Sequence, residues 1–227
     1  MSSLEIYQFF CRDDNYGVLI HDAEAGVTAS IDAPETAAVE KALSEKGWSL
    51  THIITTHHHV DHVEGHEPLK EKYGCTVIAP ASEATKIPCV DQTVADGDHF
   101  NFGNFRVEVI ETPGHTLGQV NYYLPQAKVA FTGDTLFALG CGRLFEGTPA
   151  MMWGSMVKLK KLPADTVIYC GHEYTLSNAK FAVSVDPDNA ALKERVQEIE
   201  ALRAEGKPTL PTTMAIELAT NPFLRPD

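Results

Sequence analysis

The segment 56–62, Thr-His-His-His-Val-Asp-His, constrains this chain more than any other. It places four imidazoles and one carboxylate directly after the β-rich apolar stretch 51–55. Imidazole and carboxylate groups are preferred ligands of divalent ions of the zinc and iron type. Because a loop has no packing reason to carry such a composition, the segment predicts a metal site where a buried strand opens into a loop.

The spacing within this segment predicts more than one ion. Side chains of an extended backbone alternate between two sides, so His57 and His59 share a side while His58 points away. Asp61 and His62 are adjacent and cannot share a strand face, so we expect them to address a second ion. His58 and His66 lie outside the pattern, and we expect them to support the ligands or to face solvent.

Three later segments supply further residues of the ligand type. Strand-like runs at 107–111, 128–131 and 166–170 are followed by His115, Asp134 and His172. A glycine precedes each of these residues, which lets the backbone turn and bring the side chain close. The repeated placement predicts one cluster of seven ligands at the ends of successive strands.

These motifs resemble those of the metallo-β-lactamase superfamily. The segments 133–137 (Gly-Asp-Thr-Leu-Phe), 140–148 (Gly-Cys-Gly-Arg-Leu-Phe-Glu-Gly-Thr) and 171–175 (Gly-His-Glu-Tyr-Thr) are similar to those of its hydroxyacylglutathione hydrolase family, also called glyoxalase II. The resemblance extends from about Tyr7 to Arg225. It implies an α+β fold, the four-layer αβ/βα sandwich, with a small C-terminal helical region. We therefore expect a main domain over 1–171 and a helical substrate-binding region over 172–227.

The resemblance also implies the role of each ligand. His57, His59 and His115 would bind a first ion, and Asp61, His62 and His172 a second, with Asp134 bridging both. We expect two divalent ions, zinc in the first place, with iron and manganese as alternatives because such sites discriminate modestly between them. Asp61 and Asp134 would hold and orient the hydroxide between the ions.

Substrate contacts follow from the same resemblance. Arg143, Phe145 and Tyr174 occupy positions that hold glutathione in the family. Many relatives carry lysine and tyrosine at the first two, so Arg143 keeps the charge while Phe145 lacks a hydroxyl; simple packing is the alternative role for Phe145. Relatives usually continue after 221–225 into a basic terminal helix, so this chain is either a natural short form or a clipped sequence. For a natural short form we expect weaker glutathione binding.

The activity implied is hydrolysis of S-(2-hydroxyacyl)glutathione, such as S-D-lactoylglutathione, to glutathione and D-lactate in methylglyoxal detoxification. A thiol has a pKa of about 8.5, so a thiolate leaves without a strong general acid. The alternatives are a single-iron persulfide dioxygenase, another thioester or ester hydrolase of the superfamily, and a metal-binding domain without catalysis. The number of ions per chain separates the first of these from the hydrolase.

Composition narrows the partners. Eighteen basic against thirty-one acidic residues give a net charge of −13, whereas nucleic-acid binders usually show a basic surface. No apolar run reaches membrane-spanning length, and the N-terminus lacks a signal-peptide pattern. The five cysteines are scattered, which favours reduced thiols. We expect a cytoplasmic monomer that binds neither nucleic acid nor membrane.

Local patterns predict the order of elements. Strands are expected at 4–10, 16–21, 27–31, 51–55, 75–79, 105–111, 119–124, 127–132 and 166–170. A first helix should start near Pro34 and end at Gly47. Further helices are expected at 66–73, 149–162, 175–185 and 188–205, and the Pro-rich tail 207–227 should be extended.

Overall fold

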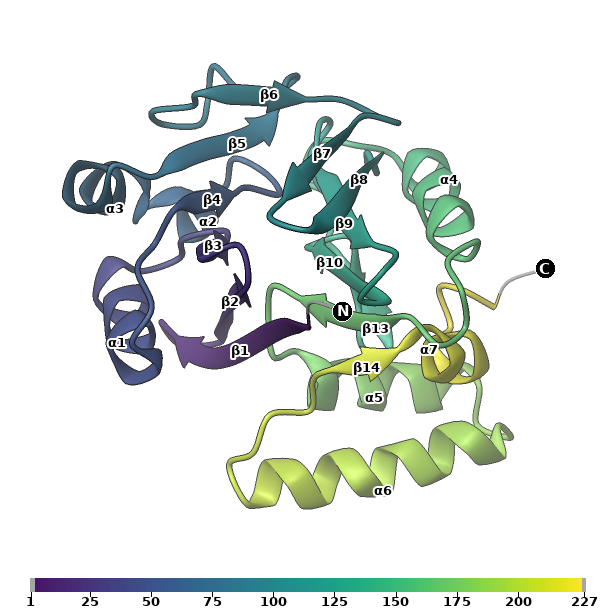
Figure 1. Ribbon diagram of the computed structural model, residues 1–227. Helices are drawn as coiled ribbons and strands as arrows, with labels where there is room; N and C mark the ends of the chain where they lie inside the picture. Colours follow the sequence, from purple (N-terminus) through teal and green to yellow (C-terminus); the bar gives the residue numbers. More distant parts are fainter. Residues whose placement is uncertain (1–2, 226–227) are drawn as a thin grey trace.

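The computed structural model describes residues 3–225, and two six-stranded sheets face each other at its centre (Figure 1). In the first sheet the spatial order of the strands equals their order in the sequence. Its strands are β1 (Leu4–Cys11), β2 (Asn15–Asp22), β3 (Val27–Ile31), β4 (His52–Ile54), β5 (Thr76–Pro80) and β6 (Gln92–Val94). The helices α1 (Thr36–Lys46), α2 (Val60–Val63) and α3 (His66–Tyr73) belong to this half.

The second sheet has the order β14-β13-β10-β9-β8-β7. Its strands are β7 (His99–Phe102), β8 (Phe105–Glu111), β9 (Val120–Leu124), β10 (Val129–Gly133), β13 (Val167–Cys170) and β14 (Thr212–Thr213). A two-stranded hairpin, β11 (Leu136–Phe137) with β12 (Gly140–Cys141), stands beside it. The helices of this half are α4 (Pro149–Leu159), α5 (Thr175–Val185), α6 (Ala190–Ala204) and α7 (Met214–Thr220).

The main core lies between the two sheets. Ile20 and Ile54 of the first sheet are buried in one cluster with Val107, Tyr122 and Phe131 of the second. A second cluster lies under α1 and α3, and a third under α4, so helices cover the outer face of each sheet (Figure 1). Burial of apolar surface stabilises all three interfaces. The layers confirm the predicted α+β, four-layer αβ/βα sandwich.

Most predicted helices are present with small shifts at their ends. The helices at 66–73 and 175–185 have the predicted bounds, and the first helix ends at Gly47, whose left-handed backbone (φ 69°) accommodates the turn. That helix begins at Thr36, so Pro34 lies before its first turn rather than inside it. The helix predicted at 149–162 ends at Leu159, and the one predicted at 188–205 spans Ala190–Ala204.

The prediction of an extended tail over 207–227 was wrong for residues 214–220, which form a helix. Its residues form β14, which pairs with β13, and then α7, while Pro226 and Asp227 lie outside the described residues. The Thr213 hydroxyl accepts a hydrogen bond from the Ile216 N–H and thereby caps α7. Met214 is fully buried under this helix. The prolines dominated the pattern and hid a short run of good helix formers.

Five short strands were not predicted: β6, β7, β11, β12 and β14. None exceeds four residues, too short for an alternating pattern to emerge. Helix α2 was also missed, because its four residues lie within the histidine-rich segment. The short strands are defined by pairing with another strand, nearby in the chain for β7, β11 and β12 and far away for β14, and such pairing is not encoded in the pattern of the strand itself.

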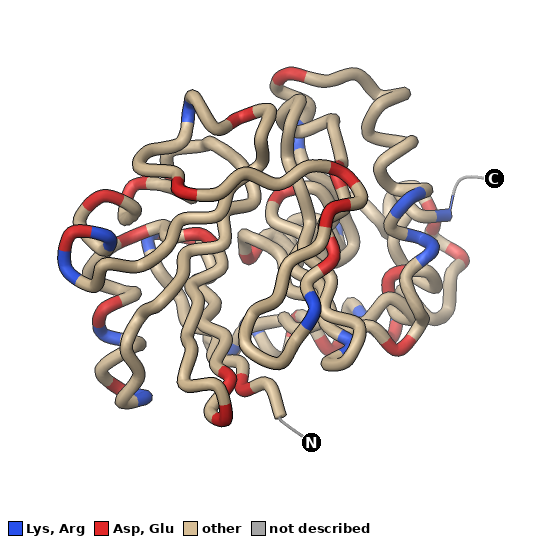
Figure 2. The backbone as a smooth tube through the Cα atoms, turned by 45° about the horizontal axis from the view of Figure 1, so that its top comes forward, with Lys and Arg blue, Asp and Glu red and all other residues tan. Residues whose placement is uncertain are grey.

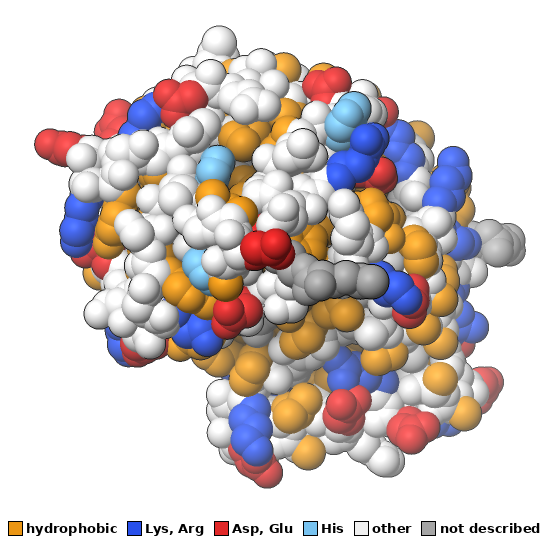
Figure 3. All heavy atoms as spheres, viewed as in Figure 1, with side chains coloured by type: hydrophobic (Ala, Val, Ile, Leu, Met, Phe, Trp, Pro, Cys, Tyr) orange, Lys and Arg blue, Asp and Glu red, His pale blue; other side chains and the backbone are white. Residues whose placement is uncertain are grey.

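Charged groups are distributed over the whole chain. Figure 2 shows Lys and Arg dispersed among Asp and Glu along the backbone, and Figure 3 shows the same mixture on one face of the molecule. Among the described residues, no helix combines the length and apolar character that crossing a bilayer requires.

Candidate metal centre and substrate pocket

The predicted ligands meet at one edge of the sandwich, where strands end in loops. Residues 55–59 follow β4, His115 lies between β8 and β9, Asp134 follows β10, and His172 follows β13. Parallel pairing of β10 with β13 brings the last two loops together. Thus segments that are far apart in sequence converge because neighbouring strands deliver them to the same edge.

Three imidazoles form a first group, His57, His59 and His115. The distance from His57 Nε2 to His59 Nδ1 is 3.1 Å, and from His59 Nδ1 to His115 Nε2 it is 3.0 Å. Burial and neighbouring imidazoles hold the pKa of His57 well below its usual value, and burial lowers the pKa of His59 and His115 as well. All three are therefore neutral near pH 7, the form that binds a metal ion.

Asp61, His62 and His172 form a second group. His172 Nε2 lies 3.3 Å from both His62 Nε2 and Asp61 Oδ2. Burial opposes a charge on His172, but the carboxylates of Asp134 and Asp61 outweigh it and raise its pKa to about 11. The same carboxylates that favour a proton there would favour a metal cation, and a bound ion would take the place of that proton.

Asp134 joins the two groups. Its Oδ2 lies 3.4 Å from His115 Nε2 and 3.3 Å from His172 Nε2, and its Oδ1 lies 3.5 Å from His62 Nε2. Burial opposes its ionisation, yet the imidazoles of His62, His172 and His115 lower its pKa. Oδ1 is buried without a hydrogen-bond partner, which is costly for a polar atom unless it serves as a ligand. The donor set and this orphaned oxygen fit a pair of divalent ions sharing one carboxylate.

The Nδ1 atoms of His62 and His172, which face away from the ligand groups, contact residues that the sequence motifs did not indicate. Asp32 Oδ2 accepts a hydrogen bond from His62 Nδ1 at 2.8 Å, and Asp14 Oδ1 accepts one from His172 Nδ1 at 2.9 Å. The Asn15 amide donates to the Asp61 carboxylate at 3.2 Å. Such partners fix the tautomer and orientation of a ligand. The signal available for Asp32 was an acid directly after the strand-like run 27–31.

Two glycines allow this close approach. Gly133 has φ 45°, and a Cβ there would lie 2.7 Å from Thr56 Oγ1. A Cβ on Gly171 would lie 2.4 Å from Asp134 Oδ1 and 2.9 Å from His62 Cε1. A side chain at either position would displace the ligands, so the glycine that precedes each later ligand is a steric requirement in these two cases.

A cavity of about 560 Å³ opens above the ligands. We call its ligand side the pocket floor: His59, Asp61, His115, Asp134 and His172. The other lining residues, which we call the pocket wall, are Phe137, Cys141, Arg143, Phe145, Tyr174, Ser177 and Asn178. All three predicted substrate contacts therefore lie in the same pocket as five of the seven predicted ligands.

Two aromatic side chains of the wall, Phe145 and Tyr174, are more exposed than the buried floor residues His115, Asp134 and His172. Phe145 is 61% exposed, yet its ring packs edge-on against His59 and His115 at 5.6 and 5.3 Å between centroids. Tyr174 stacks on His172 at 4.8 Å, and burial raises the pKa of its hydroxyl to about 12, so this group is a donor at neutral pH. The Arg143 guanidinium lies 5.9 Å from the Phe145 ring.

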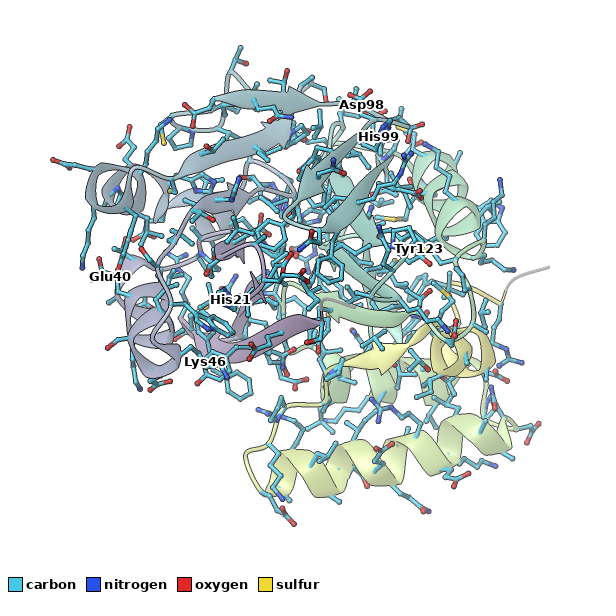
Figure 4. The ribbon with its side chains drawn as sticks, in the orientation of Figure 1. His21, Glu40, Lys46, Asp98, His99 and Tyr123 are labelled. Atoms are coloured by element: carbon cyan, nitrogen blue, oxygen red, sulfur yellow. The ribbon has the colours of Figure 1, made fainter. Side chains whose placement is uncertain are left out.

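Histidines outside the motifs have other surroundings. Figure 4 labels His21 and His99, which lie on β2 and β7. His21 stacks on Trp48 at 4.6 Å, His52 packs edge-on against Phe102, and His99 is exposed. None of these belongs to a ligand group among residues 3–225, in keeping with ordinary core or surface roles.

Comparison with known proteins agrees with this geometry. Residues 22–172 match the model of the metallo-beta-lactamase superfamily, and residues 173–227 match that of the hydroxyacylglutathione hydrolase C-terminus. Hydroxyacylglutathione hydrolases of Brucella ovis and Brucella abortus are each 65% identical over 98% of this chain and 86% of the relative.

Solved structures share the fold. ETHE1 from Myxococcus xanthus has a TM-score of 0.73 at 28% identity, covering 96% of this chain and 83% of that one. The BLEG-1 B3 metallo-beta-lactamase has a TM-score of 0.74 at 19% identity, covering 98% and 100%. The identity to the Brucella hydroxyacylglutathione hydrolases is far higher than the identity to either of these solved structures. The chain therefore belongs to the hydroxyacylglutathione hydrolase family of the metallo-β-lactamase superfamily.

Proposed function

We propose that this protein hydrolyses S-(2-hydroxyacyl)glutathione, S-D-lactoylglutathione in particular, to glutathione and the 2-hydroxy acid, as a step of methylglyoxal detoxification in the cytoplasm. The single observation that carries the proposal is Asp134, a buried carboxylate shared by two ligand groups at the floor of a pocket. The identity of 65% to hydroxyacylglutathione hydrolases supports the substrate class.

Each ligand group would hold one divalent ion, for which zinc is our first choice and iron or manganese the alternatives. His57, His59 and His115 would hold one ion, Asp61, His62 and His172 the other, with Asp134 contacting both. When bound, two such ions supply Lewis acidity that lowers the pKa of water and polarises a carbonyl oxygen.

The residues of the floor orient the reactants. Asp61 and Asp134 are ionised acceptors that fix the direction of the attacking water, since a carboxylate oxygen accepts its hydrogen. Asp32 and Asp14 keep the imidazoles of His62 and His172 in one tautomer. The thioester C–S bond breaks, and glutathione leaves as a thiolate that needs no strong acid because its pKa is about 8.5.

The wall would bind the glutathione moiety. Arg143 offers a cation to its carboxylates, Tyr174 a hydroxyl donor, and Phe145 an apolar edge next to the reacting centre. We further propose that residues 172–227, which supply Tyr174 to the wall, form the substrate-binding region appended to a main domain of residues 1–171. A monomer without nucleic-acid or membrane partners is part of the same proposal, in line with the net charge of −13.

The test is hydrolysis of S-D-lactoylglutathione, followed by loss of thioester absorbance, together with the metal content per chain. We expect turnover and two ions per chain, with turnover lost in His59→Ala. A protein that holds one iron and consumes oxygen with glutathione persulfide would instead be a persulfide dioxygenase. The second ligand group favours the hydrolase because a single ion leaves Asp61, His62 and His172 without a role.

A further inference from the structure

Glu83 is a buried carboxylate that no ligand motif includes. It lies in the turn between β5 and β6 and is only 2% exposed. The turn is closed by its own backbone hydrogen bonds, from Glu83 N to Pro80 O at 3.1 Å and from Lys86 N to Glu83 O at 2.8 Å. These hydrogen bonds fix the backbone that carries the Glu83 side chain, independently of the contacts made by its carboxylate.

Both oxygens of Glu83 are directed at the ligand loops. Oε2 accepts hydrogen bonds from the backbone N–H and from Nδ1 of His58, each at 2.8 Å. Oε1 accepts one from the backbone N–H of Gly118 at 3.0 Å. His58 stands between the ligands His57 and His59, and Gly118 is three residues after His115. A single side chain therefore links the two loops that carry all three imidazoles of the first group.

The loops meet tightly around this link. A Cβ on Gly118 would lie 2.2 Å from Ser82 Oγ and 2.7 Å from Glu83 Cγ, so only glycine fits. Glu146 adds a weaker connection on the outside: its Oε2 accepts the Leu117 N–H at 2.9 Å, and its Oε1 lies 3.5 Å from His58 Nε2. A backbone hydrogen bond from Val120 N to Thr56 O at 3.0 Å also connects the same two loops directly.

We propose that Glu83 is a positioning residue for the first ion: it sets the separation between the His57–His59 loop and the His115 loop. The inference rests on the ligand roles proposed above. A charged acceptor makes stronger hydrogen bonds to N–H groups than a neutral one, and it accepts on both oxygens at once. Glutamine keeps the volume of glutamate but turns an NH₂ group toward one of the two backbone donors, which separates that loop from the turn.

The experiment is a titration of Zn²⁺ into metal-free protein. For wild type we expect two sites, and for Glu83→Gln a dissociation constant roughly 10–100-fold higher at one site with the other unchanged, the usual range for loss of a residue that orients ligands. Gly118→Ala should disrupt the hydrogen bond from the Gly118 N–H to Glu83 and should weaken zinc binding at the same site. His58→Ala keeps its backbone N–H and should weaken it less.

Glu217→Gln is the matched control, because Glu217 is an equally buried carboxylate that contacts Leu139, Thr212 and Asn221 instead of the ligand loops. It should retain both affinities. Unchanged affinities in Glu83→Gln and Gly118→Ala, or equal weakening of both sites, would overturn the proposal. Failure of both variants to fold, seen in the circular dichroism of metal-free protein, would also overturn it, since Glu83 would then serve the fold itself. A wild type that binds neither zinc, iron nor manganese would instead refute the proposed function.

Discussion

The floor and the wall of the pocket are built in opposite ways. On the floor, Asp134 is 5% exposed and His115 and His172 are each 4% exposed; the outer ring nitrogen of His115 contacts the Arg143 carbonyl, and that of His172 contacts the Asp14 carboxylate. On the wall, Phe145 is 61% and Tyr174 37% exposed, and both are held mainly by ring contacts. The difference teaches that the reacting groups are fixed in advance, whereas the groups that would recognise the substrate keep freedom to adjust. Substitutions in the floor should therefore change metal content and kcat, whereas substitutions in the wall should mainly change KM and have smaller effects.

The largest effect is expected for Asp134→Asn. A neutral amide cannot serve both ligand groups as a carboxylate does, so metal content should fall below two ions per chain. We expect the variant to lose about 4 kcal/mol of transition-state stabilisation, which corresponds to a kcat on the order of 1000-fold lower. Thioesterase assays with metal analysis measure both. Asp165→Asn, which changes an exposed partner of Lys128, is the control. Full turnover in Asp134→Asn would contradict the bridging role.

Asp32→Asn should have the next largest effect. Asp32 Oδ1 accepts the Thr56 N–H and Oδ2 accepts from His62 Nδ1, whereas asparagine has only one acceptor oxygen; it cannot keep both contacts, so the tautomer of His62 is held less firmly. We expect metal affinity or kcat to fall roughly 10–100-fold. Asp91→Asn, an exposed partner of Lys70, should leave both unchanged. Equal behaviour of the two variants would show that the floor needs no such support.

Arg143→Ala tests the wall. Removing a charged donor to a substrate carboxylate costs about 1.5–3 kcal/mol, and we expect KM to rise roughly tenfold or more. The value of kcat should stay within about twofold, because a contact away from the reacting atoms mostly contributes uniform binding. Arg143→Lys should recover much of the affinity. A lower kcat at unchanged KM would show that Arg143 acts in the chemical step and not in substrate binding.

Phe145→Tyr should have a smaller effect in the opposite direction. A new hydroxyl at the exposed edge of the wall adds one hydrogen bond worth about 0.5–1 kcal/mol, so KM should fall by roughly two- to fivefold. Steady-state kinetics on S-D-lactoylglutathione measure it. No change in KM would assign Phe145 to packing against His59 and His115 alone.

The smallest effect concerns the hairpin behind the wall. Glu217 accepts the Leu139 N–H, and burial raises the pKa of its carboxyl despite this and other hydrogen bonds. Because the folded pKa exceeds the unfolded one, its contribution to stability is complete below the unfolded pKa and is lost as pH rises through the folded pKa. Glu217→Gln should therefore gain in Tm relative to wild type as the pH rises, measured by thermal unfolding at several pH values. A constant difference across pH would contradict this.

Local sequence predicted the convergence of the candidate ligands, for a physical reason. An extended backbone places alternate side chains on one side, so His57 and His59 converge while His58 turns away to Glu83, as the spacing predicted. Long strands and helices with clear stops were likewise predictable. Elements of two to four residues were not, since β14 and the hairpin β11–β12 depend on pairing rather than on their own pattern.

By itself the sequence determined the types and spacing of the candidate ligands and the layered α+β fold, because these follow from side-chain chemistry and from backbone periodicity. Only the tertiary structure decided which residues hold those ligands. Asp14, Asp32 and Glu83 lie on turns with ordinary local sequences, and they reach the imidazoles only because strand order and sheet packing bring those turns to the same edge. Contacts between segments far apart in the chain are set by this packing, which no short window of sequence contains.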